Sequence, residues 1–374
     1  MANVRLVDLR RDIFRTAMGA AALGAMAAGT ARPRPGLQPR VFYGGARSGN
    51  LGGPLVKIGL LQQSFPAHWS DFSLVYLLSN ALYLPDFALA ALRHRAIPLV
   101  VNQNGVFYPV WYPHGFEREN NRIGRALEAA NHVFFQSTFC KECVERFVGV
   151  APRSYEILHN AVDTGAFAPS PDAGDMKGRT LRFLFTGKIG AANGYRLLAP
   201  IRGLAAARRG GLDVALDVAG AIDLGVLAAA QREIEHLRLD AHVTLSDPYT
   251  RTAAPALYRA ADAYITTAHN DPCPNVVLEA MATGLPVLYG ASGGVPELVG
   301  PDAGVAMTVP QTFESTPVPE PQAIAEGMAQ IVANRSSMAT AARVRALERF
   351  DLGRWIARHA DVFEKLSAGR GPAS

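Results

Sequence analysis

Residues 271–299, DPCPNVVLEAMATGLPVLYGASGGVPELV, decide the fold that this sequence predicts. The stretch reads as a loop, a helix that ends at Gly284, a short buried strand and a glycine-rich turn. Asp271 precedes the predicted helix, and Glu279 lies within it, eight positions later. Because two helical turns cover about seven residues, both carboxylates are expected on the same side of its N-terminal half.

A helix N-terminus suits a diphosphate, because its free N–H groups and partial positive charge attract anions. Gly293 and Gly294 would let a second backbone segment approach that diphosphate. Carboxylates bind phosphates poorly but accept hydrogen bonds from sugar hydroxyls. The stretch therefore predicts a pocket for a sugar joined to a nucleotide.

This stretch resembles the donor-binding signature of family 4 glycosyltransferases, which belong to glycosyltransferase group 1. The signature is two acids separated by seven residues, in the setting E-G-F-P-N-V-x-L-E-A-M-A-x-G-x-P-V, followed by G-G-x-P-E. The matching residues are Asp271, Pro274, Asn275, Val276, Leu278, Glu279, Ala280, Met281, Ala282, Gly284, Pro286, Val287, Gly293, Gly294, Pro296 and Glu297. The first acid is Asp here instead of Glu. The resemblance implies an α/β chain with two Rossmann-like domains facing a cleft, the glycosyltransferase B fold, and a retaining, metal-independent reaction.

Length and composition favour some classes of protein and exclude others. The 374 residues suffice for two domains, and 49% hydrophobic with 18% charged residues favours packed cores. Residues 1–40 hold seven Arg and two Asp, so they carry the whole formal charge of +5 and the rest is neutral. This distribution argues against a nucleic-acid partner. The Cys140-x-x-Cys143 pair has no second pair to complete a zinc site, and three Cys in all fit a reducing compartment.

The N-terminal segment leaves alternatives open. Arg10 and Arg11 precede an apolar run, residues 17–31, in the order of an export signal. An exported enzyme would lack its donor, so we expect a cytoplasmic protein. The segment is then either a weak helix that touches the inner membrane surface or an extension outside the fold.

Alternating helix and strand signals predict the domain organisation. We expect an extension or linker at 1–39, an acceptor-side domain at 40–170, a nucleotide-sugar-binding domain at 171–350, and a helix crossing back with a tail at 351–374. In the second domain the expected strands are 181–186, 214–219, 243–245, 263–267 and 286–289. The expected helices are 195–209, 225–238, 253–261, 274–283, 321–334 and 338–349.

The resemblance also assigns donor-side roles. Relatives have G-R-L and a later Lys that grip the donor diphosphate, and these positions correspond to Gly187, Lys188 and Asn193. Because Asn193 carries no charge, Arg196 is the candidate second cation. The implied catalytic residues are Asp271, which orients the sugar, Glu279, which binds the ribose, and Lys188, which stabilises the leaving diphosphate. The full donor-binding set is Gly187, Lys188, Asn193, Arg196, Asp271, Pro274, Asn275, Val276, Glu279, Gly293 and Gly294, while a matching L-Y-x-x-A-D helix at 257–262 is assigned to the fold alone.

The acceptor side is expected around Gly52, Gly53, Asn104 and Gly105. Relatives have a His where Asn104 stands, and Asn cannot carry a proton, so no general base is expected there. His114 is more simply a surface or packing residue. The aromatic loop 108–114 is either an acceptor platform or local packing.

We predict a retaining, hexosyltransferase-like glycosyltransferase that needs no cofactor or metal. It would move a sugar from a nucleotide-diphosphate sugar to a glycan or lipid-linked acceptor in cell-surface polysaccharide synthesis. Two alternatives remain. One is a weakened sugar-nucleotide-binding protein, since Asp271, Asn104 and Asn193 depart from the family pattern, and the other is a nucleotide-sugar epimerase.

Overall fold

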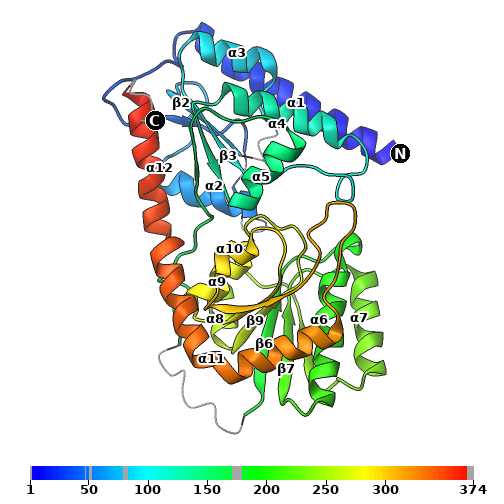
Figure 1. Ribbon diagram of the computed structural model, residues 1–374. Helices are drawn as coiled ribbons and strands as arrows, with labels where there is room; N and C mark the ends of the chain where they lie inside the picture. The colour runs from blue at the N-terminus through cyan, green and yellow to red at the C-terminus, as the bar shows by residue number, and fades with distance from the viewer. Residues whose placement is uncertain (1, 47, 50–52, 79–82, 171–178, 369–374) are drawn as a thin grey trace. The chain divides into compact units, whose positions relative to one another are not determined.

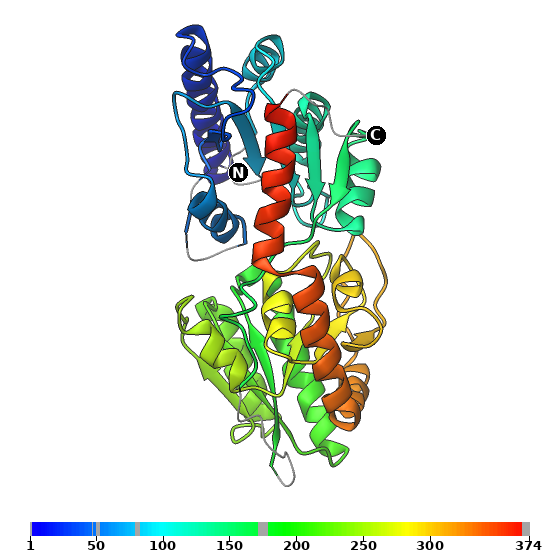
Figure 2. The same ribbon diagram turned by 90° about the vertical axis from the view of Figure 1, so that its left-hand side faces the viewer.

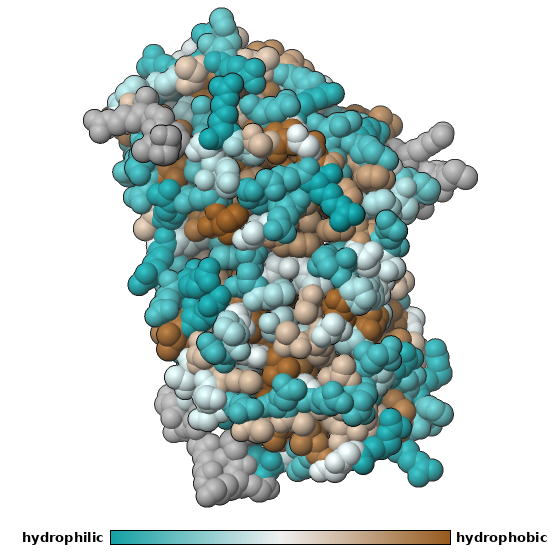
Figure 3. All heavy atoms as spheres, in the orientation of Figure 1, coloured by the Kyte–Doolittle hydropathy of each residue, from teal (hydrophilic) through white to brown (hydrophobic). Residues whose placement is uncertain are grey.

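The computed structural model describes residues 2–46, 48–49, 53–78, 83–170 and 179–368. The chain forms two compact units, one of residues 1–159 with 353–374 and one of residues 160–352. Each unit has a parallel sheet flanked by helices (Figure 1). Hydrophilic residues cover much of the face drawn in Figure 3, with apolar residues in small groups.

The first unit has a five-stranded sheet whose spatial order follows the chain. Its strands are β1 (Val41–Phe42), β2 (Leu74–Leu78), β3 (Leu99–Gln103), β4 (His132–Phe135) and β5 (Tyr155–Ile157). Its helices are α1 (Ala2–Ala27), α2 (Gly53–Ser64), α3 (Asp86–His94), α4 (Phe116–Ala129), α5 (Thr138–Phe147) and α12 (Leu352–Ser367). Strands β2, β3 and β4 are buried along their whole length, as expected for strands covered by helices on both faces.

Helix α1 packs on the first unit through one face. Arg15 is buried and pairs with Glu119 of α4 at 3.4 Å, and it also donates to Asp12 at 2.7 Å. A Cβ at Gly19 would lie 2.5 Å from Cγ of Pro85, so glycine permits the close approach to the start of α3. Among the helices described, none combines the length and the apolar character that crossing a membrane requires.

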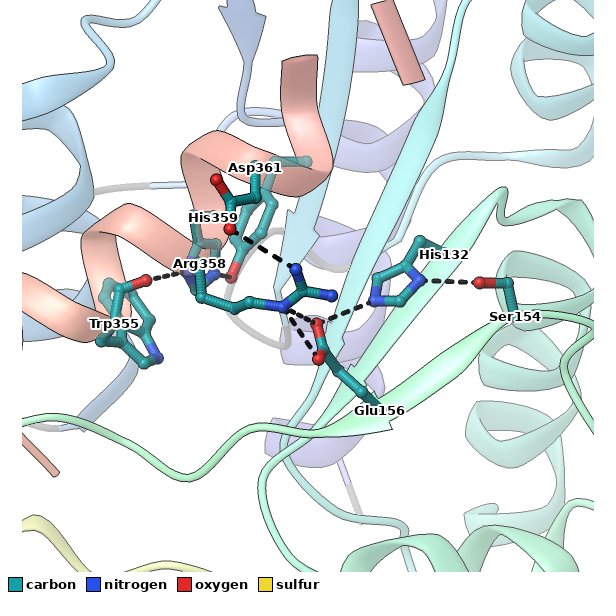
Figure 4. A network of polar contacts seen from close by, with 8 residues as sticks. His132, Ser154, Glu156, Trp355, Arg358, His359 and Asp361 are labelled. Atoms are coloured by element: carbon teal, nitrogen blue, oxygen red, sulfur yellow. Dashed lines mark hydrogen bonds and ion pairs between the residues drawn. The ribbon is translucent and has the colours of Figure 1, made fainter. Parts of the chain in front are cut away.

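Helix α12 contributes a buried histidine to the core of the first unit (Figure 4). Nε2 of His359 lies 3.0 Å from the Tyr76 hydroxyl, and Nδ1 lies 2.9 Å from the carbonyl oxygen of Trp355. Because a carbonyl can only accept, Nδ1 carries the proton and Nε2 accepts from Tyr76. Complete burial lowers the pKa of His359 to about 3, so the ring is neutral.

A polar chain ties the next turn of α12 to the sheet edge (Figure 4). Arg358 donates to Glu156 of β5 at 2.9 Å, and the same carboxylate lies 3.3 Å from His132 of β4. The other nitrogen of His132 lies 2.8 Å from the Ser154 hydroxyl. Serine, histidine and glutamate side chains form a series of polar contacts here. These contacts link neighbouring strands to α12 and therefore stabilise the fold.

The second unit has a six-stranded sheet in the order β11-β10-β9-β6-β7-β8. Its strands are β6 (Leu181–Thr186), β7 (Val214–Ala219), β8 (Val243–Ser246), β9 (Ala263–Thr266), β10 (Val287–Gly290) and β11 (Gly304–Met307). Its helices are α6 (Tyr195–Arg209), α7 (Leu224–His236), α8 (Ala254–Arg259), α9 (Asn275–Ala282), α10 (Val295–Val299) and α11 (Pro321–Arg349). The chain runs outward from β6 through β7 to β8 and then returns to β9 on the other side of β6. The carboxyl ends of β6 and β9 thus flank a topological switch point, where such sheets bind ligands.

The prediction of two helices at 321–334 and 338–349 is wrong, because α11 is a single helix of 29 residues (Figure 2). The expected break spans residues 335–337. Around it the helix is continuous, with Ser337 donating to the carbonyl of Asn334 at 2.9 Å and Thr340 to that of Ser336 at 3.1 Å. Helix α11 packs closely on α6, where a Cβ at Gly203 would lie 2.2 Å from Ile324.

Candidate active site

The predicted donor-side residues lie in segments that follow β6, β9 and β10, at the switch point of the second sheet. Gly187 and Lys188 come directly after β6. A Cβ at Gly220 would lie 1.9 Å from the carbonyl oxygen of Gly187, so the segments after β6 and β7 touch through backbone. The Lys188 side chain extends from this tied segment and is exposed to solvent.

Asn193, expected in place of a phosphate-binding lysine, closes a turn of the backbone. Its side-chain oxygen accepts from the N–H of Gly190 at 2.7 Å, next to the short 3-10 helix Ala191–Asn193. This contact holds the segment that leads from Lys188 into α6. The Asn193 side chain therefore orders the segment that carries Lys188.

Arg196, in the first turn of α6, lies close enough to Asp271 for its charge to favour the ionised carboxylate. The backbone carbonyl of Arg196 accepts from the Thr267 hydroxyl at 3.0 Å, which ties α6 to the segment after β9. Its Nε atom is buried and has no hydrogen-bond partner among the residues described. A buried, unsatisfied guanidinium nitrogen calls for an acceptor, and a phosphate oxygen would supply one.

Asp271 is half-buried on the loop between β9 and α9. Burial raises the pKa of this carboxyl, while the positive charge of Arg196 and the Cys273 N–H, at 3.2 Å, act in the opposite direction. The two glycines fix the loop: the Gly294 N–H donates to the Asp271 carbonyl at 3.0 Å, and Gly293 packs so closely that a Cβ there would lie 2.5 Å from the same oxygen. The side chain of Asp271 is thus held on a rigid loop beside a cation.

Gly293 and Gly294 were expected to approach a diphosphate, but their N–H groups are bonded within the protein. The Gly293 N–H donates to the Gln311 side chain at 3.1 Å, and Gln311 in turn donates to Asn270 at 2.6 Å. Gly293 has φ +68. The two glycines therefore permit close packing against the loop that carries Asp271.

The start of α9 is held by a residue that lies outside the predicted signature. Asn160 donates through Nδ2 to the carbonyl of Cys273 and to the side chain of Asn275, both at 2.8 Å. Pro274 precedes the first turn, and no described side chain caps it. The backbone N–H groups of Asn275 and Val276 lie at the N-terminus of α9, where an anion is favoured.

Glu279 lies in a cluster of buried tyrosines. The Tyr258 hydroxyl donates to its carboxylate at 2.9 Å, and the Thr186 hydroxyl lies 3.0 Å from Tyr258 and 3.1 Å from Tyr264. Burial raises the pKa of Glu279 to about 7, against the opposing effects of the Tyr258 hydrogen bond and the charge of Arg251. Glu279 therefore changes charge near neutral pH.

Tyr258 is the clearest residue that sequence reasoning left out of the site. The L-Y-x-x-A-D match was assigned to the fold, yet its tyrosine is fully buried and contacts Glu279 directly. Gln311 and Asn160 were also missed, and neither lies in a motif that would have singled it out.

On the predicted acceptor side, Asn104 follows β3 and is oriented by a buried lysine. Lys57 of α2, which is 4% exposed, donates to the side-chain oxygens of Asn102 at 2.9 Å and Asn104 at 3.3 Å. Gln136 also donates to the Asn104 oxygen. Because an ammonium group can only donate, the Asn104 oxygen faces Lys57. Lys57 was not predicted.

The remaining acceptor-side calls are placed as follows. Gly105 has φ +152, and its carbonyl accepts from the side chain of Gln103. Gly53 begins α2, and Gly52 lies outside the described residues. His114 is exposed.

The three cysteines, Cys140, Cys143 and Cys273, are buried and form no disulfide bond. Within the described ranges, no group of three His, Cys, Asp or Glu side chains is arranged to hold a metal ion. Cys140 lies in the first turn of α5, where its N–H is capped by Ser137 at 3.0 Å.

Comparison with known proteins points to the second unit. Residues 180–346, most of that unit, match the family described as glycosyl transferases group 1. The second unit is thus similar in sequence to this family. No curated protein sequence matches the chain.

Solved structures of several glycosyltransferases share the fold of this chain. Sucrose-phosphate synthase from Thermosynechococcus elongatus superposes with a TM-score of 0.62 at 19% identity, over 80% of this chain and 75% of that one. The Anabaena protein HepE in complex with UDP gives 0.64 at 19% identity, over 84% and 82%. The UDP-forming trehalose-phosphate synthase from Burkholderia xenovorans gives 0.57 at 13% identity, over 79% and 74%. The predicted α/β class and glycosyltransferase B fold are confirmed.

Proposed function

We propose that this chain is a glycosyltransferase that takes its sugar from a nucleotide-diphosphate sugar bound in the second unit. Arg196 carries the proposal, because its buried Nε lacks an acceptor and its charge lies beside Asp271 at the switch point. The start of α9 would add N–H groups for the same diphosphate. The Anabaena protein with this fold is described in complexes with UDP and with UDP-glucose, which supports such a donor.

The proposed roles follow from the environment of each side chain. Lys188 and Arg196 would neutralise the diphosphate, the first as an exposed point charge and the second through its planar guanidinium. Glu279 would accept hydrogen bonds from the ribose hydroxyls, with Tyr258 holding its carboxylate. Asp271, fixed by the loop of Gly293 and Gly294, would orient the transferred sugar.

We propose that the reaction proceeds with retention. The bond from the anomeric carbon to the diphosphate oxygen breaks, and the acceptor oxygen bonds to the same face of that carbon. The acceptor proton passes to the departing phosphate oxygen, so no protein base is needed, and Asn104 could not serve as one. The products are a nucleoside diphosphate and a glycoside.

The acceptor, in this proposal, is a glycan or lipid-linked sugar of cell-surface polysaccharide synthesis. Asn104 and Gly105, which follow β3, would lie on the acceptor side, with the Asn104 oxygen held by Lys57 and Gln136. We place the enzyme in the cytoplasm, where nucleotide sugars are made.

The test measures UDP binding by thermal shift and turnover as release of nucleoside diphosphate from a panel of nucleotide sugars. Ligand at one hundred times its dissociation constant should stabilise the fold by about 2.7 kcal/mol. Arg196→Met should abolish the shift with UDP. The matched control is Arg202→Met on the same helix, which loses only an exposed pair with Glu233 and should keep the shift.

Two outcomes would overturn the proposal. Equal UDP binding by wild type and Arg196→Met would show that Arg196 does not bind the diphosphate. The absence of any thermal shift with UDP would exclude a uridine-diphosphate sugar as the donor. The anomeric configuration of the product, read by NMR coupling constants, decides retention separately, and an inverted product would refute it.

A further inference from the structure

The loop that follows Asn104 and Gly105 carries four aromatic side chains in mutual contact. The rings of Phe107 and Trp111 are nearly parallel, with centroids 5.2 Å apart and an interplanar angle of 7°. Tyr112 meets the ring of Phe107 edge-on at 5.1 Å, and Tyr108 lies 5.9 Å from Trp111. Despite these contacts the Trp111 side chain is 61% exposed. We call these four residues the aromatic platform.

The aromatic platform is held by the backbone beneath it. Asn120 of α4 is 2% exposed, and its side chain forms two hydrogen bonds with Phe107, accepting from the N–H at 2.9 Å and donating to the carbonyl at 2.8 Å. The N–H groups of Trp111 and Tyr112 both donate to the carbonyl of Tyr108, at 3.1 and 2.9 Å. A buried amide and a closed turn therefore set the platform before any ligand arrives.

We propose that the aromatic platform is a carbohydrate-binding subsite that stacks a pyranose ring of the acceptor glycan on Trp111. The C–H face of a pyranose is apolar and flat, and an indole offers a rigid apolar surface of similar width. Phe107 covers one face of the indole in parallel, so the opposite face is the one offered to a ligand. This inference rests on the proposed function, since a transferase must hold an acceptor and the platform begins two residues beyond Gly105, at the carboxyl end of β3.

The geometry favours a sugar over a lipid surface. A segment that binds a membrane surface turns an apolar face with several large side chains to the lipid. Here the aromatic neighbours of Trp111 pack against its ring, and the other large exposed hydrophobic side chain described in this loop is Val110, at 38% exposure.

The experiment titrates the full chain with maltohexaose, cellohexaose and chitohexaose and records tryptophan fluorescence and isothermal heats. At least one oligosaccharide should bind the wild type, and Trp111→Ala should weaken that binding at least about tenfold, as for truncation of a central tryptophan. Trp111→Phe, which keeps a flat ring, should restore part of the affinity. Trp69→Phe is the matched control, because Trp69 is 56% exposed on another loop and should leave binding unchanged.

UDP binding, measured on the same samples, separates the two proposals. If UDP fails to bind the wild type, the proposed function fails. If UDP binds but no oligosaccharide does, or if Trp111→Ala binds the oligosaccharide as well as the wild type, the platform proposal is overturned. It is also overturned if Trp111→Ala loses only co-sedimentation with phosphatidylglycerol vesicles, which would identify the loop as a membrane contact.

Discussion

Replacing Tyr258 by Phe should move the pH dependence of donor binding to higher pH. The variant removes one hydroxyl that donates to the Glu279 carboxylate at 2.9 Å and leaves the ring in place. That hydrogen bond favours the ionised form of Glu279, whose pKa burial has already raised to about 7. Without it the carboxyl should hold its proton to a higher pH.

The magnitude follows from the strength of a hydrogen bond to a charged group, about 1.5–3 kcal/mol. One pKa unit corresponds to about 1.4 kcal/mol, so the pKa of Glu279 should rise by about one to two units, to about 8–9. At pH 7 the ionised fraction would fall from about half to roughly 1–10%. If the ionised carboxylate is the form that accepts from the ribose, UDP should bind about 5- to 50-fold more weakly at pH 7.

The assay is isothermal titration with UDP from pH 6 to pH 9.5, with wild type and variant compared at each pH so that titration of the nucleotide cancels. The ratio of dissociation constants should be largest below pH 7 and should approach one near pH 9.5. Tyr264→Phe is the matched control, because it removes a buried hydroxyl from Thr186, 3.1 Å away, in the same cluster. A ratio that does not change with pH, or an equal pH-dependent change in Tyr264→Phe, would refute the role of Tyr258.

Three further predictions follow from the described contacts. The pKa of His359 in the folded chain lies near 3, below the ordinary 6.5, so between these values only the unfolded chain binds the proton. The free energy of unfolding should therefore fall by about 1.4 kcal/mol per pH unit as pH decreases from 6.5. Urea melts of His359→Phe should show a weaker dependence of this free energy on pH, whereas the exposed control His94→Gln should keep the wild-type dependence. Asn104→Ala removes the side-chain oxygen that Lys57 and Gln136 contact, so kcat/KM for the acceptor should fall about tenfold with UDP binding unchanged, and an unchanged kcat/KM would exclude an acceptor-side role of Asn104. Gly293→Ala should abolish UDP binding because its Cβ would collide with backbone at 2.5 Å, whereas Gly211→Ala, at φ +84 with nothing within 4 Å, should cost only about 1 kcal/mol of stability and keep binding.

The strands of the second unit were predictable because apolar runs alternate with helical periodicity. The predicted strands at 181–186 and 214–219 coincide with β6 and β7, and the predicted helix at 195–209 coincides with α6. Periodicity identifies such elements because each buries a regular face. The prediction of a division at 335–337 failed because tertiary packing overrides weak local propensity, and α11 packs on the second unit on both sides of these residues, through Ile324 against α6 and through the buried Ala342 and Ala346.

The signature names candidate site residues, but the side chains around them come from distant segments. Tyr258 reaches Glu279 across 21 positions, and Gln311 reaches Gly293 across 18. Lys57 reaches Asn104 across 47. No local pattern encodes these contacts, since they depend on which strands become neighbours in the sheet. For the same reason the sequence did not predict the close approach of Gly293 to the backbone of Asp271.

The division of the chain has a consequence for biosynthesis. The second unit is one uninterrupted segment, whereas the first unit is completed by α12, which is synthesised after the whole second unit. The contact between Tyr76 and His359 spans 283 positions, so the core of the first unit stays incomplete until α12 has been synthesised. We expect the second unit to reach its native state while the nascent first unit still exposes apolar surface, which makes the unfinished N-terminal half the natural client of a chaperone.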